Sequence, residues 1–100
     1  MIKIKDVLKT EIINKDLNET LGRGYITSIS EKEANIETAI VLEEENVICI
    51  RFDNEISEVV FARIKSKEKL LMDFQRYNIE FINLNKKVTQ EIKNIMSKQK

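Results

Sequence analysis

Residues 47–64, VICIRFDNEISEVVFARI, contain two apolar runs joined by a short polar segment. The runs, Val47 to Asp53 and Ile56 to Ile64, are rich in β-branched and aromatic residues, which favour strands. With Asn54 and Glu55 as a two-residue turn, the two runs pair as an antiparallel hairpin. We therefore expect a β-hairpin at this place in the chain.

This register gives the hairpin two apolar faces. One face would carry Ile48, Ile50, Phe52, Val59 and Phe61, and the other would carry Val47, Cys49, Ile56, Val60 and Ala62. Arg51 would face Glu58 as a cross-strand ion pair. A sheet that is apolar on both sides needs a cover on both sides.

Two further strand-like runs precede this hairpin. They are Tyr25 to Ser30 and Ala34 to Leu42, and the second alternates apolar and polar residues. The connections between the four runs are short and polar, so sequential strands are expected to pair. Residues 25–64 therefore predict a four-stranded antiparallel meander.

The segment before the meander, residues 5–21, predicts a helix. Ile4, Val7, Leu8 and Ile12 fall on one helical face. Gly22 follows the segment and suits a helix end, because glycine accepts the left-handed conformation there.

The last third of the chain, residues 66–97, predicts one long helix that begins with Ser66 as its N-cap. Alternating spacings of four and three relate its main apolar residues, which are Leu70, Phe74, Tyr77, Phe81, Leu84 and Val88. The predicted fold class is α+β, a single domain over residues 1–100 in which this coiled-coil-like helix packs on the sheet.

A straight helix of this length would measure about 48 Å. A globular domain of this size is only about 33 Å across, so the helix would either kink around residues 83–85 or leave the domain. Its far end would then need a partner to bury its apolar residues. We therefore expect a homodimer or higher oligomer with an interface formed by Phe81, Leu84, Val88, Ile92, Ile95 and Met96.

The composition excludes several kinds of enzyme. The chain has no histidine and only one cysteine, Cys49, so it can form neither a Ser-His-Asp triad nor an internal disulfide. The common phosphate-binding loop motifs are missing, and the spacing of Glu43, Glu44 and Glu45 does not match a calcium loop. We expect no enzymatic activity, no cofactor and no metal, and we expect Cys49 to be a buried apolar residue.

The net charge is 0, but the charges are segregated along the chain. Residues 31–58 hold nine acidic against two basic side chains, and residues 59–100 hold ten basic against four acidic ones. Lys86, Lys93 and Lys100 recur every seven residues, and a second lysine group lies at residues 65–69. Such basic stripes are typical of phosphate binding, so weak nucleic-acid binding is a less favoured alternative.

A second alternative is a small anionic, nucleotide-like ligand. Arg23, Gly24 and Tyr25 combine a guanidinium, a flexible backbone and an aromatic ring, which together suit an anion. Glycines that only end a helix and begin a strand would explain the same residues. If a pocket exists, we expect it at a subunit boundary that also includes Arg63, Arg76 and Tyr77.

The sequence favours a small non-enzymatic binding protein that acts as a homo-oligomer and binds a protein partner as a regulator or inhibitor. Charged residues interrupt any apolar segment near the N-terminus and no run is long enough to cross a bilayer, so we expect a cytoplasmic protein with no membrane contact. Its small size, together with 16 Ile, 13 Lys and 9 Asn, is typical of a phage or mobile element with an A/T-rich genome.

Overall fold

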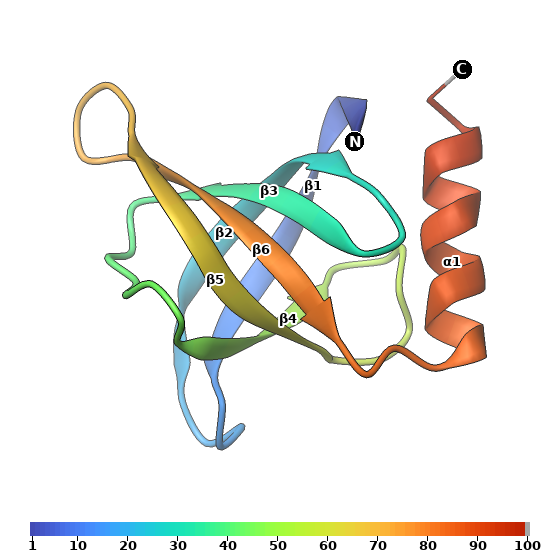
Figure 1. The fold of residues 1–100 in the computed structure, drawn as a ribbon, viewed down its shortest axis with the longest axis horizontal. Coiled ribbons are helices and arrows are strands. Elements are labelled where there is room, and N and C mark those ends of the chain that lie inside the picture. Colours follow the sequence, from blue (N-terminus) through green and yellow to red (C-terminus); the bar gives the residue numbers. More distant parts are fainter. Residues whose placement is uncertain (100) are drawn as a thin grey trace.

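The computed structural model describes residues 1–99, which form a six-stranded barrel and one helix (Figure 1). The elements in chain order are β1 (Ile2–Asn14), β2 (Thr20–Ile29), β3 (Glu33–Thr38), β4 (Val47–Phe52), β5 (Val60–Lys69), β6 (Gln75–Ile82) and α1 (Lys86–Ser97). No helix within residues 1–99 is long and apolar enough to pass through a bilayer.

The strands close in the order β1-β2-β3-β6-β5-β4, and every neighbouring pair is antiparallel. β3 pairs with β6 and β4 pairs with β1, so the chain leaves one side of the barrel after β3 and returns on the other at β4. Closure leaves no unpaired strand edge. The predicted α+β fold with a meander is wrong, because consecutive strands β3 and β4 are not neighbours.

Branched aliphatic side chains fill the barrel. The largest fully buried residues include Ile12, Ile26, Ile36, Ile50, Ile64, Ile79 and Tyr77. They come from all six strands and form one continuous core with three helix residues, Val88, Ile92 and Ile95. Six strands of a chain this short can therefore enclose a full core without a second layer of helices.

The predicted helix at residues 5–21 is wrong, because this segment forms most of β1 and the turn into β2. Ile4, Leu8 and Ile12 are all buried, but they are four residues apart and thus also share one face of a strand. Thr10 lies between them and is fully buried, where its hydroxyl donates to the carbonyl of Gly24 at 2.8 Å.

The predicted long helix at residues 66–97 is also wrong. Residues 60–69 form β5, residues 75–82 form β6, and only α1 is helical. Its 12 residues make a helix of about 18 Å, which fits a molecule with a longest dimension of 31 Å. The helix begins where a kink was expected: Asn85 is the N-cap, and its side chain accepts a hydrogen bond from the amide of Val88 at 2.8 Å.

The hairpin at residues 47–64 exists as β4 and β5, but its register differs by one residue. Ile50 pairs with Val60, not with Val59, because the loop between the strands is longer than a two-residue turn. A slip of one residue exchanges the faces of one strand. The interior therefore holds Ile48, Ile50, Phe52, Val60, Ala62 and Ile64, while Phe61 points outward and is 38% exposed.

Helix α1 covers one end of the barrel (Figure 1). Glu91 accepts hydrogen bonds from Ser57 in the β4–β5 loop, and Lys93 lies 3.3 Å from Glu31 in the β2–β3 turn. Val88, Ile92 and Ile95 face the core from this position. We call this the helix end of the molecule.

Candidate functional site

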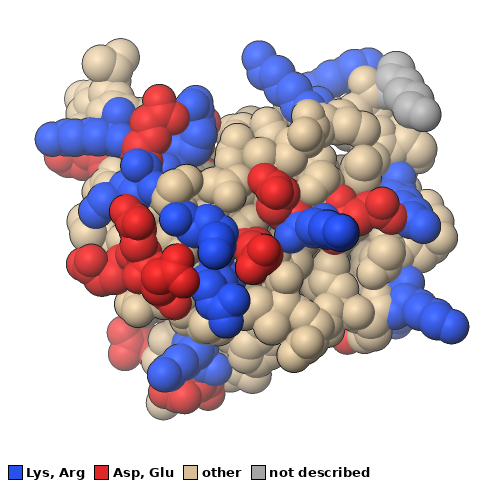
Figure 2. All heavy atoms as spheres, viewed as in Figure 1, with Lys and Arg blue, Asp and Glu red and all other residues tan. Residues whose placement is uncertain are grey.

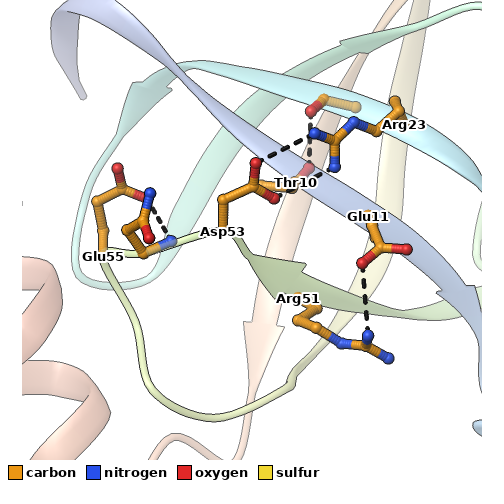
Figure 3. A network of polar contacts seen from close by, with 8 residues as sticks. Thr10, Glu11, Arg23, Arg51, Asp53 and Glu55 are labelled. Carbon is orange, nitrogen blue, oxygen red and sulfur yellow. Dashed lines mark hydrogen bonds and ion pairs between the residues drawn. The ribbon is translucent and has the colours of Figure 1, made fainter.

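The four arginines lie on the barrel exterior, and each is paired with a carboxylate. Arg23 on β2 reaches past β1 to Asp53 with two contacts of 3.1 and 3.2 Å, and Arg51 on β4 approaches Glu11 on β1 at 3.4 Å (Figure 3). Arg51 therefore does not pair with Glu58, as the shorter hairpin turn had suggested. Neither guanidinium is held open for an anionic ligand.

The other two arginines are paired in the same way. Arg63 lies 3.8 Å from Glu80, and Arg76 contacts both Glu37 at 3.1 Å and Glu68 at 3.0 Å. The hydrogen bond that Arg76 donates to Glu37 is the main cause that raises the pKa of Arg76 above its ordinary value, so this side chain stays charged. These pairs join β5, β6 and β3 across the outer surface.

The residues predicted for the anionic-ligand site are dispersed. Gly24 is packed against the core, where a Cβ atom would lie 2.6 Å from the Cδ1 atom of Ile36. Tyr25 lies on the barrel exterior beside Glu37. Tyr77 is fully buried, and its hydroxyl group forms hydrogen bonds with the backbone of the β3–β4 loop. None of these residues lines one of the main surface hollows of residues 1–99.

The residues predicted for an oligomer interface lie against the barrel. Phe81, Val88, Ile92 and Ile95 are buried, and Leu84 and Met96 pack on the same core. The reason for expecting self-association through them was a helix too long for the domain. That reason no longer applies to α1.

The lysines of the predicted basic stripes lie on two different elements. Lys65, Lys67 and Lys69 lie on β5, while Lys86 and Lys93 lie on α1 at the helix end. Lys93 is also paired with Glu31. Lys100, the third residue of the predicted helical stripe, lies outside the described residues.

The opposite end of the barrel carries three loops, because β1, β3 and β5 all run toward it and β2, β4 and β6 run away from it. They are the β1–β2 turn (residues 15–19), the β3–β4 loop (residues 39–46) and the β5–β6 turn (residues 70–74). We call this the three-loop end. The β5–β6 turn projects beyond the barrel at the upper left of Figure 1, and in Figure 2 the tip at this place shows uncharged atoms above a charged base.

The three-loop end exposes large apolar side chains. Leu71 and Met72 are each 89% exposed, Val41 is 65% exposed and Phe74 is 40% exposed. We call these four residues the apolar ridge. Met72 has a φ of 61°, in the left-handed region, where glycine or asparagine is the usual residue. A large apolar residue at such a turn adds nothing to the barrel core.

Two hollows meet at this ridge. Val41, Met72 and Phe74 line one of about 460 Å³, together with Lys69. Val41 and Leu21 line the second, of about 370 Å³, together with Glu43. Asp73 also lines the first hollow, and Lys15 and Asp16 also line the second, so each hollow carries charges of both signs.

Hydrogen bonds hold the loops of this end in place. The amide of Leu42 donates to the Tyr77 hydroxyl at 2.7 Å, and this hydroxyl donates to the carbonyl of Ile40 at 3.0 Å. The amide of Leu70 donates to the carbonyl of Phe74 at 2.9 Å and closes the β5–β6 turn. The apolar ridge is therefore presented on ordered backbone.

Several charges of the three-loop end have no partner. Lys65 approaches Glu45 at 3.9 Å, but the side chains of Lys67, Lys69, Glu43 and Glu44 make no ion pair or hydrogen bond within residues 1–99. This differs from the barrel wall, where all four arginines are paired.

Cys49 is fully buried, as expected. Burial, and to a smaller extent the nearby Asp16, raises the pKa of its thiol, so the reactive thiolate is disfavoured. No group of three or more carboxylate or thiol side chains suited to a metal ion occurs in the described part of the chain. Buried side-chain nitrogen and oxygen atoms of residues 1–99 all have hydrogen-bond partners.

No family model matches this chain, and a search of curated proteins finds no match either. The three-loop end is thus identified by its own geometry. Sequence reasoning missed it because residues 70–74, LLMDF, were assigned to a helical seam. The signal was three adjacent apolar residues followed at once by a charged one, which suits an exposed turn better than a seam with spacings of three and four.

Proposed function

We propose that this protein is a non-enzymatic binding module that docks on a protein partner through its three-loop end. The observation that carries the proposal is the apolar ridge, where Leu71 and Met72 are almost fully exposed on an ordered turn. Burying one such side chain in an interface contributes about 1.5–3 kcal/mol. Exposed apolar residues rimmed by charged ones are typical of protein interaction sites.

The chemistry of the chain supports binding over catalysis. The sequence has no histidine, and its one thiol, Cys49, is buried with a raised pKa. The arginines that could hold a small anion are each engaged by a carboxylate. Regulation or inhibition of the partner, a cytoplasmic location and an origin in a phage or mobile element stay predictions from the sequence.

Capture from an extract of the organism that encodes the chain tests this proposal. The immobilised wild-type protein is compared with the double variant Leu71→Ser/Met72→Ser and with the control Val7→Ser. Val7 is an exposed apolar residue of β1, far along the strand from the three-loop end. We expect one or more proteins to bind the wild type and the control and to be lost with the double variant. Equal capture by all three proteins would contradict the proposal.

A further inference from the structure

We propose that the open edge of β5 at the three-loop end binds an extended, acidic segment of a partner protein, which adds to the sheet as an antiparallel strand. This inference rests on the proposed function, because it names the kind of segment that docks at the same end of the molecule. The open edge consists of residues 67–69, and we call it the β5 edge. Leu71 and Met72 of the apolar ridge follow it closely in the chain.

Beyond the barrel wall, β5 has a neighbouring strand on one side only. Its pairing with β4 ends at Arg63, and the hydrogen bonds of Ile64 to the β3–β4 loop are its last backbone contacts on that side within residues 1–99. On the other side β5 stays paired with β6 as far as Lys69, and the two strands project together in Figure 1. Closure therefore pairs the strands of the wall but leaves β5 open on one side at residues 67–69.

The backbone groups of the β5 edge alternate between β6 and solvent. The amide of Leu70 donates to the carbonyl of Phe74, so Leu70 and Glu68 direct their backbone groups toward β6. Lys67 and Lys69 occupy the alternate positions, so their N–H and C=O groups point away from β6, where no strand of residues 1–99 pairs with them. Such an edge is complementary to the backbone of another extended chain.

Two lysines give the β5 edge its preference for an acidic strand. Lys67 and Lys69 are exposed and make no ion pair or side-chain hydrogen bond within residues 1–99. They are two residues apart, so they share one face of the strand. In an antiparallel pair the residues directly opposite them have side chains on the same face, where a glutamate or aspartate forms an ion pair with each lysine.

The acidic residues near this edge leave both lysines available. Glu68 lies on the opposite face of β5, where it contacts Arg76 at 3.0 Å. Glu45 approaches Lys65 at 3.9 Å, before the edge begins, and Asp73 in the β5–β6 turn forms no ion pair with either lysine of the edge. The acidic β3–β4 loop borders only the barrel end of the edge, so acidic residues are favoured opposite the two lysines and not beyond them.

A second copy of the chain is a poor occupant of the β5 edge. Two such edges paired about a two-fold axis would place lysine directly opposite lysine, which destabilises a strand pair. Lysine on an edge strand is a common protection against pairing with like chains. This protection does not act against a strand that carries carboxylates at the matching positions.

A peptide titration tests the inference. The probe is the peptide TVETETVT, blocked at both ends, whose two glutamates have the same spacing as Lys67 and Lys69. Nuclear magnetic resonance of the isotope-labelled protein follows the addition of peptide to about 5 mM, and we expect a Kd of about 1 mM or below. The shift changes should centre on residues 67–69, and the amides of Lys67 and Lys69 should exchange with solvent more slowly when the peptide is bound.

Two methylated peptides separate backbone pairing from charge attraction. N-methylation of both glutamates removes the donors that face β5 but keeps the charge, so we expect binding at least about tenfold weaker. N-methylation of the two threonines that follow the glutamates alters only the outer edge of the added strand. This second peptide should bind within about threefold of the unmodified one.

Two protein variants test the charge preference. Lys67→Glu/Lys69→Glu should bind TVETETVT at least about fivefold more weakly than the wild type does, and it should bind the basic peptide TVKTKTVT instead. The control is Lys86→Glu/Lys87→Glu, which makes the same change in net charge on exposed residues at the helix end. This control should bind both peptides as the wild type does.

Three results would overturn the inference: no binding of TVETETVT, equal binding of the two methylated peptides, or shift changes that lie away from β5. If the amides of Lys67 and Lys69 already exchange slowly in the concentrated free protein, a second copy covers the edge and the inference is wrong. The capture experiment with the ridge variant is independent of these results. If the peptide binds but capture does not depend on the ridge, the edge is a binding site and the proposed function of the ridge fails.

Discussion

Tyr77→Phe should destabilise the protein by about 2 kcal/mol, because one hydroxyl group fastens the β3–β4 loop to the barrel. Tyr77 is fully buried, and its hydroxyl accepts from Leu42 and donates to Ile40. The substitution keeps the ring and its packing but leaves the buried amide of Leu42 without a partner. An unpaired buried group of this kind costs about 1–3 kcal/mol. Water can reach the partly exposed Ile40, so we count only the amide.

For a domain of this size, a loss of about 2 kcal/mol lowers the melting temperature by roughly 8–16 °C. Urea denaturation and a thermal melt measure both quantities. The matched control is Tyr25→Phe, since Tyr25 lies on the barrel exterior and its hydroxyl makes no hydrogen bond within residues 1–99. The control should change the stability by less than about 0.5 kcal/mol. If Tyr77→Phe changes the stability as little as the control does, the anchoring role of the hydroxyl is refuted.

The same substitution has a local consequence that hydrogen exchange detects. The amide of Leu42 should exchange slowly in the wild type and faster in Tyr77→Phe, by more than the loss of global stability explains. This loop carries Val41, the central residue of the apolar ridge. A looser loop should also weaken docking at the three-loop end under conditions in which the variant is still folded.

Gly24→Ala should lower the free energy of unfolding, measured by urea denaturation, by about 1–3 kcal/mol, because the new Cβ atom would lie 2.6 Å from the Cδ1 atom of Ile36. An unchanged urea midpoint would contradict this packing. Ile92→Ala should lower the free energy of unfolding by about 2–5 kcal/mol, because Ile92 is fully buried against the barrel. If Ile92 instead lay in an exposed interface, the substitution would change the oligomeric state and leave the stability of the monomer unchanged. The thiol of Cys49 should react with a disulfide reagent at least about 100-fold faster in denaturant than in buffer, as burial protects it and raises its pKa; comparable rates would mean an accessible thiol.

The strands that the sequence predicts correctly are those with clear alternation and polar boundaries. A strand was expected over residues 47–53 and β4 occupies residues 47–52, while parts of β2, β3 and β5 lie in the other three predicted runs. The order of the strands could not be read from these runs. It depends on β1 and β6 joining the barrel, and both segments were assigned to helices.

The two wrong helices have a common cause. A spacing of four residues fits one face of a helix and also one face of a strand, since four is a multiple of two. Ile4, Leu8 and Ile12 satisfy both patterns, and so do Tyr77 and Phe81. In β6 the decisive residue is Ile79, which lies between the last two and is fully buried, as a strand requires and a single helical stripe does not.

The three-loop end could not be predicted from periodicity, because residues that serve a surface need not follow the period of a core. Leu71 and Met72 were assigned to a buried helix, yet the barrel is complete without them. Polar residues at this turn would fold as well, because a side chain that is exposed in both the folded and the unfolded chain contributes little to stability. Met72 also has a φ of 61°, which glycine would adopt with less strain. Folding alone does not account for a large apolar residue in that conformation, and the proposed docking at the three-loop end supplies a reason for it.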